Sequence, residues 1–233
     1  MLEVSALHAH YGRAHILADV ALSVTAGEVM VLLGRNGAGK STTMKAIMGL
    51  VRPSAGHVIF AGQDITGREP FEIARLGLGY VPEERRIFTD LTVMENLEVG
   101  RRPAREGQRA WTPERLFALF PSLADLRDRP GGRMSGGEQQ MLTIARTLMG
   151  NPRLVLLDEP SEGLAPVVVE RMAQAIRALK ADGLSILLSE QNLHLARLVS
   201  DRATIIEKGR IRWSGTLEEL VAAPEVREQY LSV

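Results

Sequence analysis

The sequence predicts an α/β fold in which a mostly parallel sheet follows an N-terminal antiparallel β part and is interrupted by a helical insertion. The apolar runs 29–33 and 154–157 end in a glycine or in acidic residues, as strands buried on both faces do. Helical patterns separate such runs, and this alternation favours parallel strands joined by right-handed crossovers. We expect a single domain over 1–233, with a core of about 1–81 and 150–233 and a helical subdomain of about 82–149.

Composition excludes several classes of protein. The chain has 233 residues, with 28 basic and 28 acidic side chains and no cysteine. Zero formal charge argues against a chain that coats nucleic acid or an anionic membrane, and the lack of cysteine excludes disulfides and thiolate zinc sites. No run approaches the roughly 18 apolar residues of a membrane span, and the first residues do not resemble a signal peptide. We therefore expect a cytoplasmic protein.

The first third of the chain predicts the antiparallel part and the start of the parallel sheet. Residues 1–27 alternate apolar and polar side chains around short β-branched pieces, which is typical of two or three antiparallel strands. The apolar run 29–33 is followed by a helical pattern over 41–50. Two further strands are expected at 57–60 and 77–81.

Helical spacing dominates the middle of the chain, and strand–helix alternation returns after it. Between about 82 and 130 apolar residues recur at helical spacing, and we interpret the arginine-rich stretch 101–109 as a solvated loop. Residues 215–233 predict one short helix, to which no function is assigned. The elements expected after the insertion are, in order, helix 138–149, strand 154–157, helix 167–181, strand 185–188, helix 193–199 and strand 203–206.

The segment after strand 29–33 predicts a phosphate-binding loop. It reads GRNGAGKS and matches G-x-x-x-x-G-K-[ST] between a strand and a helix, the context that this motif requires. Its glycines let backbone N–H groups face phosphate oxygens, and the helix N-terminus adds a positive dipole end. Lys40 would bind the β- and γ-phosphates, and the Ser41 hydroxyl would ligate Mg²⁺. The predicted nucleotide-binding residues here are Gly34, Arg35, Asn36, Gly37, Ala38, Gly39, Lys40, Ser41 and Thr42.

The apolar run 154–157 ends in two carboxylates, Asp158 and Glu159. Buried strands rarely end in paired acids unless a cation or a proton transfer needs them. Asp158 would lie near Mg²⁺, and Glu159 would act as the general base toward the attacking water. Such a pair can also cap the next helix, but the phosphate loop in the same chain favours the catalytic interpretation.

A third motif, MSGGEQQ, opens a helix. Ser135 and Glu138 have the spacing of a capping box, which explains these two residues structurally. It does not explain Gly136 and Gly137, which leave N–H groups open to an anion. A second anion-binding helix start in one chain indicates either two nucleotide sites or one site made by two chains.

In this order and spacing the three motifs resemble the nucleotide-binding subunits of ABC transporters, and the resemblance covers essentially the whole chain. GRNGAGKST is similar to the Walker A loop, MSGGEQQ to the signature motif and LLDEP to the Walker B strand. The resemblance implies a P-loop NTPase fold of the ABC ATPase type, ATP and Mg²⁺ as cofactors, and a dimer in which residues 135–138 of one subunit complete the other's site. It also implies that Tyr11 stacks on adenine, although an exposed tyrosine at a strand edge is often a packing residue.

Two positions depart from the family pattern. Glu83 stands where the family usually has a glutamine that contacts Mg²⁺ and water; a carboxylate can still ligate Mg²⁺, while the orientation of the water is left open. Gln191 stands where a histidine usually contacts the γ-phosphate. Glutamine can donate a hydrogen bond there but cannot carry charge. We keep Gln191 beside Glu159 as a predicted catalytic residue, and Glu83 as a predicted metal ligand.

These departures and the segment SEGLAP at 161–166 resemble the branched-chain amino-acid importers of bacteria, and also the urea and short-amide importers. The resemblance implies import driven by ATP at the cytoplasmic face of the membrane. Its implied partners are a second ATPase subunit, identical or not, two membrane permeases that meet a groove near 83–88, and indirectly a solute-binding protein.

Two other functions fit the sequence less well. ABC ATPases that act on nucleic acid or ribosomes usually carry two cassettes, coiled coils or zinc insertions, and this chain has one cassette, no heptads and no cysteine. We therefore expect no nucleic-acid partner. A regulatory module that binds nucleotide without hydrolysis fits the missing histidine, but Glu159 argues against it.

Overall fold

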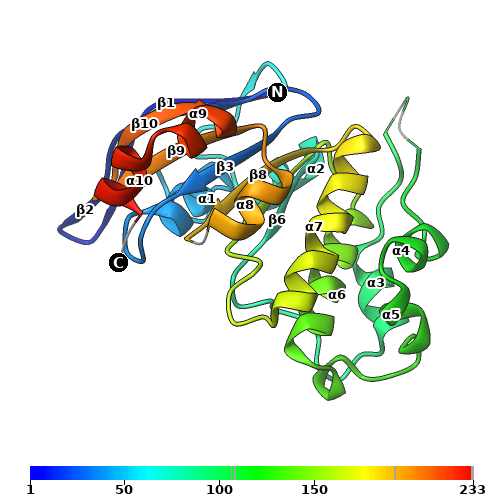
Figure 1. Ribbon diagram of the computed structural model, residues 1–233. Coiled ribbons are helices and arrows are strands. Elements are labelled where there is room, and N and C mark those ends of the chain that lie inside the picture. Colours follow the sequence, from blue (N-terminus) through cyan, green and yellow to red (C-terminus); the bar gives the residue numbers. More distant parts are fainter. Residues whose placement is uncertain (106, 108, 192, 232–233) are drawn as a thin grey trace.

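The computed structural model describes residues 1–105, 107, 109–191 and 193–231, and it contains two sheets (Figure 1). The antiparallel sheet has the strand order β2-β1-β4-β5. The second sheet has the order β10-β9-β3-β8-β7-β6, in which β9, β3, β8, β7 and β6 run parallel and β10 pairs antiparallel with β9. This arrangement confirms the predicted fold class. The antiparallel strands are β1 (Leu2–Tyr11), β2 (Ala14–Val24), β4 (Ala55–Phe60) and β5 (Gln63–Asp64). The strands of the second sheet are β3 (Val29–Leu33), β6 (Leu78–Val81), β7 (Leu154–Asp158), β8 (Ser185–Glu190), β9 (Arg202–Glu207) and β10 (Arg210–Thr216).

Helices cover both faces of the mostly parallel sheet. Helix α1 (Lys40–Ile47) lies between the two sheets, in a core cluster that includes Leu7 of β1 and Met30 of β3. The opposite face packs on α6 (Gly136–Leu148), α7 (Pro166–Ala181) and α8 (Leu193–Val199). Burial on both faces explains why β3, β7 and β8 read as continuous apolar runs.

The helical insertion between β6 and β7 forms its own side of the molecule. Figure 1 shows α3 to α6 together, away from strands β1 and β2. Thr92 caps α3 through a capping box with Glu95, so the start of this helix is encoded locally. The helices that precede α6 here are α3 (Val93–Gly100), α4 (Pro113–Leu119) and α5 (Pro121–Asp125). Helix α2 (Pro70–Leu76) precedes β6.

One sequence prediction needs correction, and another holds with one added contact. The expected single helix over 215–233 is instead the end of β10 followed by α9 (Leu217–Ala222) and α10 (Pro224–Tyr230), because Thr216 caps α9 and Pro224 starts a new helix; residues 232 and 233 lie outside the described part. The described part of the stretch 101–109 agrees with the predicted solvated loop, since it contains no helix or strand and residues 101–104, 107 and 109 are exposed. The Arg105 guanidinium is half-buried and donates to the carbonyl of Asn151, while residues 106 and 108 are not described.

None of the helices in the described ranges is long and apolar enough to cross a membrane.

Candidate active site

The predicted phosphate loop joins the end of β3 to the first turn of α1. A Cβ atom on Gly34 would lie 2.4 Å from the carbonyl oxygen of Ile206, so only glycine fits there. Lys40 is the first residue of α1, and its Nζ donates to the carbonyl oxygens of Gly34 at 2.7 Å and Arg35 at 3.0 Å. The ammonium therefore lies across the inside of the loop, where a phosphate would bind.

Lys40 is also paired with Glu159. Its Nζ lies 3.0 Å from Glu159 Oε1, and the two side chains are only 2% and 9% exposed. Glu159 follows β7 with a φ of +44°, and its backbone N–H donates to Ser189 Oγ at 3.0 Å. Because a buried charge without a partner is costly, each of these groups neutralises the other when no phosphate is present.

Asp158, the last residue of β7, is held from three sides. Ser41 Oγ donates to its Oδ1 at 3.0 Å, Ser189 Oγ donates to the same oxygen at 2.7 Å, and the Tyr80 hydroxyl donates to Oδ2 at 3.1 Å. The fold thus brings the Ser41 hydroxyl and the Asp158 carboxylate together, as the sequence predicts. Such oxygen donors suit Mg²⁺.

The protein supplies only part of a magnesium shell. The described residues contain no group of three or more His, Cys, Asp or Glu side chains that could hold a metal ion. Mg²⁺ commonly binds through one or two carboxylates and completes its shell with substrate phosphates and water. Ser41 and Asp158 therefore fit a metal that arrives with a nucleotide.

Glu83 lies two residues after the end of β6, near the carboxylates of Glu159 and Glu162. Partial desolvation and the neighbouring charges of Glu162 and Glu159 raise the pKa of Glu83. A cation placed among these carboxylates would relieve their repulsion. The position is compatible with the predicted metal contact, which stays a prediction.

Sequence reasoning missed Glu190, the last residue of β8. Its carboxylate is 2% exposed and accepts a hydrogen bond from the Ser161 N–H at 3.2 Å. Burial raises its pKa to about 7. The signal was present in the sequence, because strand 185–190 is a buried run that ends in an acid, as β7 does. The predicted Gln191 follows it, and both line a cavity of about 620 Å³ together with Glu159.

Tyr11 ends β1 and pairs with Ala14 of β2 across a short turn. Its side chain is 49% exposed. The ring is thus available for stacking, but its role with adenine stays a prediction.

The signature segment lies at the start of α6, in the helical insertion and apart from α1 (Figure 1). The Ser135 N–H donates to Glu138 Oε2 at 2.8 Å, and the Glu138 N–H donates to Ser135 Oγ at 3.4 Å. The capping box is therefore formed. The structure does not bring Ser135 to Lys40 within one chain, so a shared site would need a second copy.

The two glycines of this segment have a packing reason in addition to the proposed anion contact. A Cβ atom on Gly136 would lie 2.6 Å from the guanidinium of Arg85, and one on Gly137 would lie 2.8 Å from Val168 Cγ1. Packing thus favours glycine at Gly137, whereas the flexible Arg85 guanidinium could move away from a side chain at position 136.

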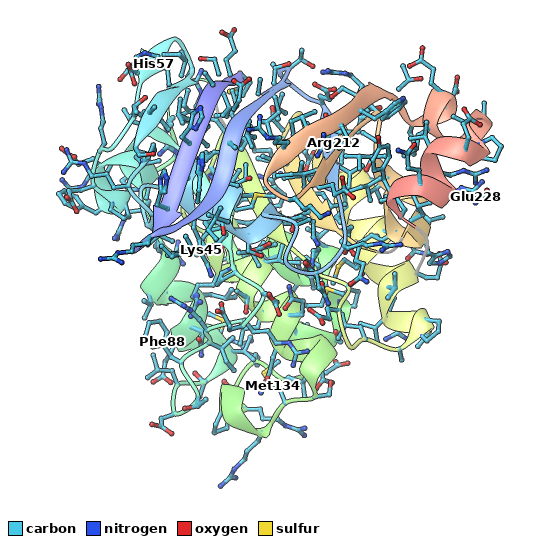
Figure 2. All side chains as sticks on the ribbon, turned by 90° about the vertical axis from the view of Figure 1, so that its left-hand side faces the viewer. Lys45, His57, Phe88, Met134, Arg212 and Glu228 are labelled. Atoms are coloured by element: carbon cyan, nitrogen blue, oxygen red, sulfur yellow. The ribbon has the colours of Figure 1, made fainter. Side chains whose placement is uncertain are left out.

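An apolar groove of about 880 Å³ lies where the helical insertion meets the core. Of the stretch 83–88, where a groove is predicted, only Phe88 lines it; Glu83 and Ile87 border a separate depression. Phe88 lies at the surface in Figure 2, on the side that also carries Lys45 of α1. The Arg146 guanidinium lies 5.0 Å from the centroid of the Phe88 ring. The exposed apolar side chains of the groove are Leu50, Phe71, Phe88 and Val99, and its arginines are Arg75, Arg102, Arg105 and Arg146.

Comparison with known proteins identifies this arrangement. Residues 17–162 match the family model described as ABC transporter. The chain belongs to the ABC transporter family. It is 39% identical over 99% of both chains to the high-affinity branched-chain amino acid transport ATP-binding protein BraG of Pseudomonas aeruginosa. It is 37% identical to the lipopolysaccharide export system ATP-binding protein LptB of Acidithiobacillus ferridurans, over 99% of this chain and 96% of that one.

Solved ABC cassettes have the same fold. A nucleotide-free ATP-binding cassette superposes with a TM-score of 0.83 at 29% identity, over 98% of this chain and 97% of that one. The ADP conformation of an ATP-binding cassette superposes with a TM-score of 0.82, also at 29% identity and over the same shares of both chains. This ABC ATPase therefore binds ATP, and it couples ATP hydrolysis to transport.

Proposed function

We propose that this ABC ATPase powers the import of branched-chain amino acids. The observation that carries the proposal is the 39% identity with BraG over 99% of both chains. A probable branched-chain amino acid transport ATP-binding protein LivF of Archaeoglobus fulgidus, 36% identical over 95% of this chain and 94% of that one, supports it. The residues Glu83 and Gln191 and the segment 161–166 resemble the same branch.

The proposed roles follow from the contacts in the site. Lys40 leaves Glu159 and binds the β- and γ-phosphates, since a phosphate offers more negative charge than one carboxylate. Ser41 and Asp158, with Glu83 nearby, hold Mg²⁺, which supplies positive charge to the phosphate oxygens. Glu159, freed from Lys40, takes the proton of the attacking water.

The other predicted residues complete the nucleotide site. Tyr11 stacks on adenine, and Gln191 donates a hydrogen bond toward the γ-phosphate from the wall of the cavity that it shares with Glu159. Residues 135–138 of a second subunit, identical or not, face the γ-phosphate across the dimer. The helix start of α6 offers N–H groups for that contact.

The groove around Phe88 is the proposed docking site of the membrane permeases, at the cytoplasmic face of the membrane. Exposed apolar side chains line it, and single-chain proteins rarely leave such a patch uncovered. Its arginines suit a permease segment that carries apolar side chains and a carboxylate. A solute-binding protein would then act only through the permeases.

Uptake measurements test the proposal. A strain that lacks this chain is expected to lose high-affinity uptake of leucine, isoleucine and valine, and the wild-type chain is expected to restore it. The Glu159→Gln variant should assemble with the permeases without restoring uptake. Unchanged uptake of all three amino acids in the deletion strain would overturn the import proposal.

Lipopolysaccharide export is the second candidate, because LptB is 37% identical over 99% of this chain. The same deletion strain separates the two functions. Intact amino-acid uptake together with lipopolysaccharide retained in the inner membrane would favour export.

A further inference from the structure

Tyr80 belongs both to the apolar groove and to the site around Asp158. Tyr80 lines the apolar groove together with Met48, Leu50 and Phe88. Its hydroxyl donates a hydrogen bond to Asp158 Oδ2 at 3.1 Å. One residue therefore borders the groove and also contacts the carboxylate that is expected to bind the metal.

The backbone holds Tyr80 firmly in this place. It belongs to β6, which pairs in parallel with β7, and it lies opposite Leu156, two residues before Asp158. Its side chain is half-buried and packs against the core cluster that contains Met44 of α1. Because α1 also carries Ser41, the ring lies among the elements that form the metal site.

The hydrogen bond gives Tyr80 a defined effect on Asp158. Ser41 and Ser189 both donate to Oδ1, while Tyr80 donates to Oδ2. Donors on both oxygens fix the rotation of a carboxylate, which donors on one oxygen alone do not. An ionised carboxylate only accepts hydrogen bonds, so the Tyr80 hydroxyl is the donor in this contact.

We propose that Tyr80 is a positioning residue: it orients Asp158 for the metal, and it transmits occupancy of the groove to that carboxylate. The second half rests on the proposed function, because it needs a permease segment in the groove. A segment that presses on the ring shifts the hydroxyl, and Asp158 then loses or regains its hydrogen bond on Oδ2. A permease segment in the groove thereby affects the metal site directly through Tyr80, and no movement of the helical insertion is needed.

The first half is tested by Tyr80→Phe in the isolated subunit. This change removes the hydroxyl and keeps the ring, and Tyr230→Phe on α10 is the matched control. The readout is the dissociation constant of a non-hydrolysable ATP analogue, measured by calorimetry with Mg²⁺ and again with EDTA. Partners that orient a metal ligand typically contribute about tenfold or more to metal affinity.

Tyr80→Phe is therefore expected to weaken binding about tenfold with Mg²⁺ and to leave binding with EDTA unchanged. A purely structural hydroxyl would alter both constants equally or neither, and either outcome would overturn the positioning role. Tyr230→Phe should match the wild type under both conditions.

The second half is tested in the transporter assembled with its membrane permeases. Tyr80→Phe should co-purify with them but lose at least half of the increase in ATP hydrolysis that the permeases produce, at saturating Mg²⁺. Full stimulation of the variant would overturn the coupling role. If the wild-type chain itself fails to bind permeases, the coupling role fails together with the proposed function. The calorimetry of the isolated subunit, with Mg²⁺ and with EDTA, then still decides the positioning role.

Discussion

Glu190 is expected to make the stability of this protein depend on pH. Burial first of all, and the charge of Glu159 in addition, raise its pKa to about 7 from an ordinary value of 4.5, although the Ser161 contact and Lys40 act in the opposite direction. The folded chain therefore binds a proton more tightly than the unfolded chain. The contribution of Glu190 to stability is fully present below about pH 4.5, falls as the pH rises toward 7, and is lost above it. The difference amounts to about 3 kcal/mol.

Replacing Glu190 by glutamine removes this dependence, because an amide of the same shape does not titrate. Urea denaturation of the wild type and of Glu190→Gln at pH 5 and pH 8 measures it. At each pH, the free energy of unfolding of the wild type is subtracted from that of the variant. This difference should be about 2–3 kcal/mol larger at pH 8 than at pH 5, because only the wild type loses stability as Glu190 ionises. Glu3→Gln, at an exposed position of β1, controls for the loss of a carboxylate. Parallel profiles for the wild type and Glu190→Gln would refute the reasoning.

Three further changes test the site. Glu159→Gln should lower the rate of phosphate release at least 100-fold, since the general base is lost, while a filter assay still finds bound ATP; ordinary turnover would contradict the base role. Lys40→Ala should abolish ATP binding in calorimetry, and unchanged affinity would contradict the phosphate-loop role. The same change leaves Glu159 buried without its partner, so it should also lower the free energy of unfolding by about 3–5 kcal/mol. Ser135→Ala should cost about 1 kcal/mol in urea denaturation through the lost cap of α6, and an unchanged value would contradict the capping box.

The phosphate loop could be predicted from sequence because its structure depends on local features. A buried strand, glycines at fixed positions and a helix that begins at Lys40 determine where the loop lies, and the neighbours that exclude a side chain at Gly34 only reinforce it. The caps of α3 and α6 are local in the same way, since each pairs residues three apart.

The rest of the site depends on which strands are neighbours. Strand β8 lies between β3 and β7, so Ser189 meets Asp158 and Glu190 lies beside the phosphate loop. Spacing along the chain carries no information on that order. Tyr80 was missed for the same reason, since only the pairing of β6 with β7 brings its hydroxyl to Asp158. The contact of Arg105 could not be predicted either, because its partner, the Asn151 carbonyl, is distant in sequence.

Glu159 and Lys40 together indicate why this ABC ATPase would hydrolyse ATP only when its site is filled. In the structure the ammonium neutralises the carboxylate that is proposed to be the general base, and both are buried. While the Lys40 ammonium lies 3.0 Å from Oε1, that oxygen of Glu159 is occupied by an ion pair and is not free to accept a hydrogen bond from a water. On the proposed roles, the γ-phosphate draws Lys40 away and leaves Glu159 free, so the substrate itself creates the base. A second subunit that places residues 135–138 over the phosphate would hold this state, and hydrolysis would then follow assembly of the dimer.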